Sequence, residues 1–239
     1  MKQFKNVALV TGASRGIGKS IALKLKNSGF YVIGTCTTET KISFDHVDEM
    51  ITVDFDDEDS TNNFYLQVEK MQSISLLVNN AGINIIKSQL EVKLEEYNRI
   101  HNINLKIPYF LSSIVATKMS KTGGGKIVNI ASIWSIVTKK NRTLYTTMKS
   151  GIHGLTRSMA VEWASNNILI NTVSPGFINT DLTRNSLSKQ EISSIEKSIP
   201  LNRLANPDEV AELVYFLGSN LNTYLTGQNI LIDGGFTLV

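Results

Sequence analysis

The chain has 239 residues, of which 42% are hydrophobic and 19% are charged, and its net charge at pH 7 is +3. This balance is ordinary for a globular protein; it excludes a disordered chain, and so small and dispersed a charge does not predict nucleic-acid binding. The length suits one layered core, so we expect a single domain over residues 1–239.

Membrane and cross-linking patterns are both missing from the sequence. No run approaches the roughly 20 apolar residues of a membrane span, and residues 1–6 lead into an apolar run without a secretory segment. We therefore expect a cytoplasmic protein with no membrane partner. The one cysteine, Cys36, excludes an intrachain disulfide, and three scattered histidines predict no metal site.

Seven short apolar, β-branched runs have the length and composition of buried strands. They are residues 7–10, 31–35, 50–53, 75–78, 126–130, 168–173 and 229–232. Apolar residues three and four apart predict helices between them, at 17–27, 60–71, 94–120, 144–165 and 207–219. This alternation predicts an α/β Rossmann fold: a doubly wound, seven-stranded parallel sheet with helices on both faces. The link between residues 35 and 50 is short and polar, so its helix should be stunted or absent.

A glycine-rich turn, residues 11–18, follows the first expected strand and opens the first helix. Gly12 permits the tight turn, Gly16 lets the backbone approach a ligand, and Gly18 lets the helix pack close to the sheet. Free N–H groups at the helix N-terminus then bind anionic oxygen. The turn therefore predicts a dinucleotide pyrophosphate site, formed by Gly12, Ser14, Arg15, Gly16, Ile17 and Gly18.

The end of the second expected strand indicates which dinucleotide binds. An NAD site places a carboxylate there for the ribose 2′-hydroxyl, but residues 34–38 contain no acid. A 2′-phosphate would instead meet the Arg15 guanidinium and the hydroxyls of Thr37 and Thr38. We therefore expect NADP(H) in preference to NAD(H). The alternative is that Arg15 lies in solvent and Glu39 reaches the ribose.

Tyr145 and Lys149 are four residues apart on an expected helix, which places both on one face. The ammonium should lower a phenol pKa that starts near about 10, which suits Tyr145 to proton transfer. The spacing alone is common by chance, but here it follows Ser132, which comes after the fifth expected strand. That hydroxyl can face the phenol and hold a substrate oxygen between them.

These motifs, in this order, resemble the short-chain dehydrogenase/reductase family, and within it the 3-oxoacyl-acyl carrier protein reductases. The resemblance extends from residues 11–18 to residues 233–235. It implies an NAD(P)-dependent oxidoreductase that moves a hydride between nicotinamide and a carbonyl or hydroxyl carbon. It also implies a catalytic tetrad, which this chain retains as Asn104, Ser132, Tyr145 and Lys149.

The resemblance extends the cofactor site and implies an assembly. Asp54 matches an adenine-contacting acid, Lys149 would also bond the nicotinamide ribose, and Asn104 would steady a water that relays protons to Lys149. We expect a homotetramer built through the helices at 94–120 and 144–165 and the C-terminal strand. Beyond the turn, the cofactor-binding set is Thr37, Asp54, Asn80, Ala81, Gly82, Tyr145, Lys149, Pro175, Gly176 and Thr180.

Two departures from the carrier-protein reductases concern the substrate. Basic docking residues are expected before the fifth strand and in the loop before the sixth, where this chain has Gly123 and Asn166. The loop at 133–144 is also unusual, because Trp134 and three basic residues replace small ones. Either these charges receive an anionic substrate beside a Trp134 wall, or they form a solvated rim with Trp134 in a subunit contact. The three basic residues are Lys139, Lys140 and Arg142.

The sequence therefore favours a reductase of a small carbonyl compound, thioester-linked if the carrier-protein likeness holds, with residues 181–198 as a modest lid. A keto-sugar or other specialised carbonyl compound is the alternative substrate. The nucleotide-sugar epimerases and dehydratases share the tyrosine–lysine spacing, but they are longer and use another glycine spacing. A dinucleotide sensor without chemistry is the alternative of another class, and the intact tetrad argues against it.

Overall fold

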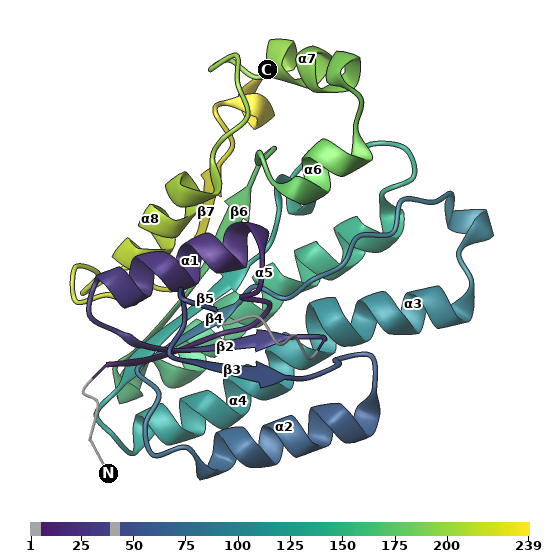
Figure 1. The fold of residues 1–239 in the computed structure, drawn as a ribbon. Coiled ribbons are helices and arrows are strands. Elements are labelled where there is room, and N and C mark those ends of the chain that lie inside the picture. The colour runs from purple at the N-terminus through teal and green to yellow at the C-terminus, as the bar shows by residue number, and fades with distance from the viewer. Residues whose placement is uncertain (1–5, 39–43) are drawn as a thin grey trace.

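The computed structural model describes residues 6–38 and 44–239. Its seven parallel strands form one sheet in the order β3-β2-β1-β4-β5-β6-β7, which confirms the predicted fold (Figure 1). The order reverses between β1 and β4, and this is where such sheets bind ligands. The strands are β1 (Val7–Val10), β2 (Tyr31–Cys36), β3 (Glu49–Thr52), β4 (Leu76–Asn79), β5 (Gly125–Ile130), β6 (Ile168–Pro175) and β7 (Asn229–Ile232).

Helices cover both faces of the sheet, as predicted. In Figure 1, α1 and α8 lie together on one side, while α2, α4 and α5 lie on the other. The shorter α6 and α7 extend past the carboxyl ends of the strands. The helices are α1 (Gly16–Asn27), α2 (Glu58–Lys70), α3 (Leu94–His101), α4 (Ile107–Ser120), α5 (Thr143–Trp163), α6 (Asp181–Ser186), α7 (Lys189–Ser198) and α8 (Pro207–Gly218).

Strand β1 shows how the sequence produces two cores. Its residues are all buried, and because successive side chains point to opposite faces, Val7 and Leu9 join one core while Ala8 and Val10 join the other. The first core packs against α2, α4 and α5, and the second against α1 and α8. A strand buried on both faces has no polar alternation, which is why β1 reads as a continuous apolar run.

The predicted helix at 94–120 is interrupted. A π-helical segment, Asn102–Lys106, separates α3 from α4. Pro108, in the first turn of α4, has no N–H to bond the carbonyl four residues back, at Asn104, so the regular ladder cannot continue there. The interruption places Asn104 in the irregular turn, with its side chain buried.

The segment at 181–198 forms two helices rather than one. Ser188 ends the link between α6 and α7 and caps α7: its Oγ accepts from Glu191 N at 3.2 Å, and its own N–H donates to Glu191 Oε2 at 2.8 Å. This reciprocal pair satisfies the first free donors of a new helix and so favours a new start at this residue.

The link between β2 and β3 contains no helix in the part that the structure describes, residues 37–38 and 44–48. This agrees with the expected stunted connection. None of the helices that the structure describes has the length and hydropathy needed to cross a membrane.

Candidate active site

The glycine-rich turn lies where the strand order reverses, and it has the backbone that a close ligand requires. Gly12 and Gly16 adopt φ values of +67° and +55°, in the left-handed region that favours glycine. The N-terminal N–H groups of α1 have no side-chain cap, and its first turn holds no acid. These donors are therefore free for an anion, and the turn fits a dinucleotide pyrophosphate.

The loop after β4 holds the glycine-rich turn in place through hydrogen bonds. Asn80 Nδ2 donates to the carbonyl oxygens of Thr11 at 2.9 Å and Gly12 at 3.1 Å, while Thr11 Oγ1 accepts from the N–H groups of Asn80 and Ala81, each at 3.0 Å. A Cβ added at Gly18 would collide with Gly12 O and Asn80 Nδ2. The expected residues of both loops thus meet in one rigid cradle.

His46 is a part of this cradle that the sequence did not reveal. Its side chain is buried and its Nε2 lies 2.9 Å from the carbonyl oxygen of Ala13. Burial lowers the pKa of the imidazole, so the neutral ring is favoured. Strand β2 supports the same turn, since Thr35 Oγ1 accepts from Gly12 N at 3.0 Å. A lone histidine in a loop carries no motif, so only its spatial position identifies it.

The residues expected around the adenosine half lie at the ends of three neighbouring strands. Arg15 directly precedes α1, Thr37 follows β2, and Asp54 comes shortly after β3; all three are exposed. Because β1, β2 and β3 are adjacent and parallel, their carboxyl ends share one edge. Thr38 is exposed beside Thr37, whereas Glu39 falls outside the residues that the structure describes.

Tyr145 and Lys149 come from the first turns of α5, as the spacing predicts. Lys149 Nζ lies 5.8 Å from the centre of the Tyr145 ring and donates to Ile130 O, at the end of β5, at 2.8 Å. Ser132 follows that strand and is nine-tenths buried. Its hydroxyl makes a hydrogen bond with the Tyr145 phenol, so two hydroxyls that are distant in the sequence come together here.

Burial has the largest effect on the pKa values of Tyr145 and Lys149. It raises the pKa of Tyr145 to about 12, against the opposing effects of the Ser132 hydrogen bond and the Arg142 charge. Burial also lowers the pKa of Lys149 to about 8. The expectation that the lysine depresses the phenol pKa is therefore not met without cofactor, because desolvation outweighs the nearby charges. At neutral pH the phenol holds its proton.

Asn104 reaches the same place from the π-helical segment. Its Nδ2 donates to Ile83 O at 2.8 Å and its Oδ1 accepts from Ile83 N at 2.9 Å, which fixes both the amide and the loop after β4. A Cβ added at Gly82 would lie 3.5 Å from Asn104 Oδ1 and 3.5 Å from Lys149 Nζ. Gly82 therefore leaves the space in which these two side chains approach each other.

A buried polar chain beneath these residues joins the central strands. Asn79 Nδ2 donates to Asn129 Oδ1 at 2.7 Å, and Asn129 Nδ2 donates to Thr156 Oγ1 at 2.9 Å. Thr172 Oγ1 then donates to Thr156 Oγ1 at 2.7 Å, so β4, β5, β6 and α5 are linked. Asn79 and Asn129 occupy paired positions on β4 and β5. These two polar residues among apolar neighbours were the sign of the polar chain that the sequence offered.

The segment after β6 closes the other side of the site. Pro175 ends β6, and Gly176 N donates to Ile232 O at 3.0 Å. Thr180 caps α6, and a Cβ added at Gly16 would lie 3.6 Å from Thr180 Cγ2. The expected nicotinamide-side residue Thr180 is thus next to the expected phosphate-side residue Gly16.

The loop before α5 is buried at two of its side chains, Trp134 and Arg142. Trp134 is nine-tenths buried and packs edge-on against Phe177 and Phe236, with ring centres 6.1 and 6.5 Å away. The Arg142 guanidinium lies 5.0 Å from the centre of the Trp134 ring and is only 9% exposed, while Lys139 Nζ lies 5.4 Å from that ring. Lys140 remains exposed. The rim alternative is therefore wrong for Arg142, and Trp134 is covered by its own chain.

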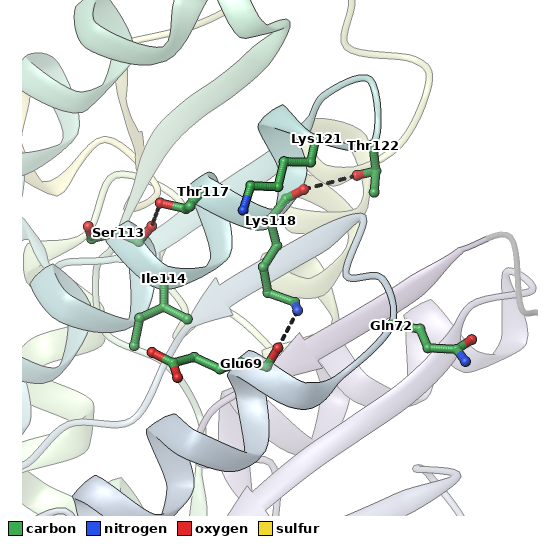
Figure 2. A pocket seen from close by; sticks show the side chains of 8 residues that line it. All are labelled: Glu69, Gln72, Ser113, Ile114, Thr117, Lys118, Lys121 and Thr122. Atoms are coloured by element: carbon green, nitrogen blue, oxygen red, sulfur yellow. Dashed lines mark hydrogen bonds between the residues drawn. The ribbon is translucent and has the colours of Figure 1, made fainter.

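A second hollow lies away from these residues. Figure 2 shows this pocket of about 460 Å³ between the C-terminal ends of α2 and α4, which is the end of the sheet opposite the cradle. Lys118 Nζ crosses it to donate to Glu69 O at 2.7 Å. Among the described residues, no group of three or more His, Cys, Asp or Glu side chains is placed to hold a metal ion.

The doubly wound sheet with a glycine cradle at its switch point defines the Rossmann class of dinucleotide-binding proteins. A family model described as enoyl-(acyl carrier protein) reductase matches residues 12–237. The 3-oxoacyl-[acyl-carrier-protein] reductase FabG of Vibrio harveyi is 37% identical over 240 residues, which are 98% of each chain. The chain belongs to the short-chain dehydrogenase/reductase family, and it is an NAD(P)-dependent oxidoreductase.

Solved structures agree with this assignment. A short-chain type dehydrogenase/reductase from Mycobacterium marinum has a TM-score of 0.88 at 31% identity, covering 98% of this chain and 96% of its own. A Beutenbergia cavernae protein, provisionally described as an NAD(P)-dependent gluconate 5-dehydrogenase, has a TM-score of 0.93 at 30% identity over 98% of both chains. Its crystal contains NADP at low occupancy.

Proposed function

We propose that this protein reduces a ketone with NADPH and that Tyr145 is the general acid. The observation that carries the proposal is the meeting of Tyr145, Lys149 and Ser132 beside the dinucleotide cradle. A reduced nicotinamide supplies the hydride when bound. Tyr145 gives its phenolic proton to the carbonyl oxygen, which Ser132 holds by a hydrogen bond. The raised pKa of Tyr145 keeps that proton in place at neutral pH, as reduction requires.

Lys149 and Asn104 support the proton transfer. The Lys149 ammonium stabilises the phenolate that remains after Tyr145 gives up its proton, and it would also bond the nicotinamide ribose of a bound cofactor. Asn104 holds a water that returns a proton toward Lys149, which is consistent with the approach of both side chains to Gly82. Reversal of the same steps oxidises the alcohol.

We propose NADP(H) as the preferred cofactor. Arg15 and Thr37 are exposed on the rim where a 2′-phosphate would lie, and neither Thr37 nor Thr38 offers a carboxylate to a ribose hydroxyl. The cradle residues proposed to hold the pyrophosphate are Gly12, Ser14, Arg15, Gly16, Ile17 and Gly18. Those proposed for the remainder of the cofactor are Thr37, Asp54, Asn80, Ala81, Gly82, Tyr145, Lys149, Pro175, Gly176 and Thr180.

Two substrate classes are proposed. The first is a 3-oxoacyl thioester, by likeness to the carrier-protein reductases, although Gly123 and Asn166 stand where carrier-docking bases are expected. The second is a ketone of a sugar or another small specialised compound, favoured by the likeness to the Beutenbergia cavernae protein and by the buried Arg142 near Tyr145. Residues 181–198 would act as a lid over either substrate.

We also propose a homotetramer. Tyr109 and Phe110 on α4 are 54% and 47% exposed, and Val161 on α5 is 82% exposed. Apolar side chains on both long helices and at the C-terminus give the surface that subunit contacts require. Leu238 and Val239, at the end of the chain, are 85% and 88% exposed.

The direct test of the chemistry is Tyr145→Phe, which removes the phenolic hydroxyl and keeps the ring. Reduction of any accepted ketone should fall by roughly 10³-fold or more, as expected for loss of a general acid. NADPH affinity, measured by the change in NADPH fluorescence, should fall far less than the rate, because the cradle is untouched and Tyr145 is one of many proposed cofactor contacts. A variant that retains more than about a tenth of the wild-type rate would contradict the assignment of Tyr145 as the general acid. A wild type that binds NADPH but reduces no member of a broad carbonyl panel would support the dinucleotide sensor instead.

A further inference from the structure

Arg142 carries a charge that its surroundings do not neutralise. The side chain is 9% exposed, and its Nε and Nη1 atoms are buried without a hydrogen-bond partner among the described residues. The ion pairs found in the described part of the chain involve other residues, and Arg142 has none. A buried cation is costly unless it is paired, and unsatisfied buried donors in a folded protein require an explanation.

The position of Arg142 is fixed by its neighbours rather than by a counter-ion. Its guanidinium lies 5.0 Å from the centre of the Trp134 ring, and Trp134 is held in turn by Phe177 and Phe236. Stacking on an indole face stabilises a guanidinium while leaving its in-plane N–H groups available. The aromatic group thus holds Arg142 without using its N–H donors. Nε and Nη1 are covered by protein atoms, so a ligand reaches them only when a covering side chain moves.

Arg142 also lies beside the proposed general acid. It is the residue that precedes α5, and Tyr145 is three residues further on, about one helical turn away. The two groups are close enough for each charge to affect the other's pKa. Anything that bonds the free Arg142 donors therefore lies next to the carbonyl that Tyr145 protonates.

We propose that Arg142 binds a carboxylate of the substrate, so that the natural substrate is a short keto acid or acidic keto-sugar. This inference rests on the proposed ketone reduction and deepens it by naming the substrate class. A carboxylate fits because a guanidinium offers it charge-assisted hydrogen bonds in a fixed direction. The phosphate of a carrier-linked thioester is many bonds away from its ketone, so it cannot reach Arg142 while the ketone is at Tyr145. Lys139, over the same indole ring, adds positive charge near this subsite.

The kinetic test compares acetoacetate with its uncharged methyl ester, methyl acetoacetate, using NADPH as the hydride donor. The wild type should prefer the acid in kcat/KM by about tenfold or more. Arg142→Gln should abolish most of this preference, lowering it about tenfold and mainly through KM for the acid, and Arg142→Lys should retain part of it. The matched control is Lys140→Gln, an exposed charge on the same loop, which should keep the wild-type preference. Equal preference in the wild type and Arg142→Gln would overturn the subsite.

A binding measurement separates failure of this subsite from failure of the proposed chemistry. The chain has two tryptophans, so Trp163→Phe leaves Trp134, which touches Arg142, as the fluorescent reporter. Acetoacetate should change the Trp134 emission saturably, methyl acetoacetate should not, and Arg142→Gln should abolish the response. This outcome supports the subsite even if no ketone is turned over. Saturation by inorganic phosphate but not by acetoacetate would overturn the carboxylate assignment, and so would the absence of any saturable response.

Discussion

Burial acts on Tyr145 and Lys149 in opposite directions, and this determines which protonation states the site holds. Desolvation penalises the charged form of each, so the pKa of the phenol rises to about 12 and the pKa of the ammonium falls to about 8. The free protein at neutral pH therefore has a proton on Tyr145 ready for donation. Lys149 is mostly cationic below its pKa of about 8, and it loses its charge as the pH rises above that value.

The lowered pKa of Lys149 has a consequence for stability. Below about pH 8 the lysine is charged in both the folded and the unfolded chain, and the burial penalty is fully present. As the pH rises from about 8 to 10.5, the folded chain loses this proton first, so the free energy of unfolding increases. Relative to Lys149→Met, the wild type should gain about 2 kcal/mol between about pH 7.5 and 9.5, measured by urea denaturation. Tyr145 does not interfere, because its phenol keeps its proton in both states over most of this window.

The control for this measurement is Lys140→Met, whose side chain is exposed, so that no burial penalty attaches to its charge. A difference between wild type and Lys149→Met that stays constant with pH would show that burial does not determine the charge of Lys149.

At the scale of elements, the start of α1 is fixed by contact with the loop after β4. Gly18 lies so close to Gly12 O and Asn80 Nδ2 that a Cβ cannot be accommodated without movement. Asn80 is also the residue that bonds the backbone of the turn. The helix, the turn and the loop therefore form one unit, and a shift of any of them displaces the phosphate-binding N–H groups.

Gly18→Ala should therefore destabilise the protein by about 2 kcal/mol, as overpacking does, and should weaken NADPH binding in parallel. The control is Asn63→Ala in α2, an exposed helical position away from both the cradle and the proposed subunit contacts. There the substitution should be neutral or slightly stabilising, since alanine is the better helix former. Urea denaturation and NADPH titration of both variants check this. Equal unfolding free energies for the two variants would contradict the packing account of Gly18.

At the scale of the whole molecule, the sequence predicted what depends on repeating patterns. The alternation of apolar runs and helical spacing predicted all seven strands and the doubly wound sheet, because strands buried on both faces must be apolar throughout. The glycine-rich turn and Ser132 were found because each follows a strand, and parallel strands bring their carboxyl ends to one edge. Tyr145 and Lys149 were found by their helical spacing, and Asn104 and Asp54 by the family resemblance. The interruption at Asn102–Lys106 was missed because apolar periodicity continues through it.

What the sequence could not predict depends on three-dimensional contacts. His46 was missed because nothing near it in the chain marks its contact with Ala13. The burial of Arg142 on Trp134 was not predicted, because it depends on side-chain contacts that the sequence does not show. The pKa of Tyr145 was expected to fall, because sequence spacing reveals a neighbouring charge but not the desolvation that outweighs it.

The measurement that tests the central claim most directly is the initial rate of NADPH oxidation, with NADH in parallel, using an acetoacetyl thioester and acetoacetate as ketones. We predict turnover of at least one of them, with kcat/KM for NADPH roughly tenfold or more above that for NADH, because we expect the Arg15 guanidinium to bind the 2′-phosphate. Faster turnover of acetoacetate would favour the keto-acid class, and faster turnover of the thioester would favour the carrier-linked class. A preference for NADH would contradict an NADPH-dependent reductase, and tight NADPH binding without consumption of either ketone would instead point to a reductase of a specialised carbonyl compound.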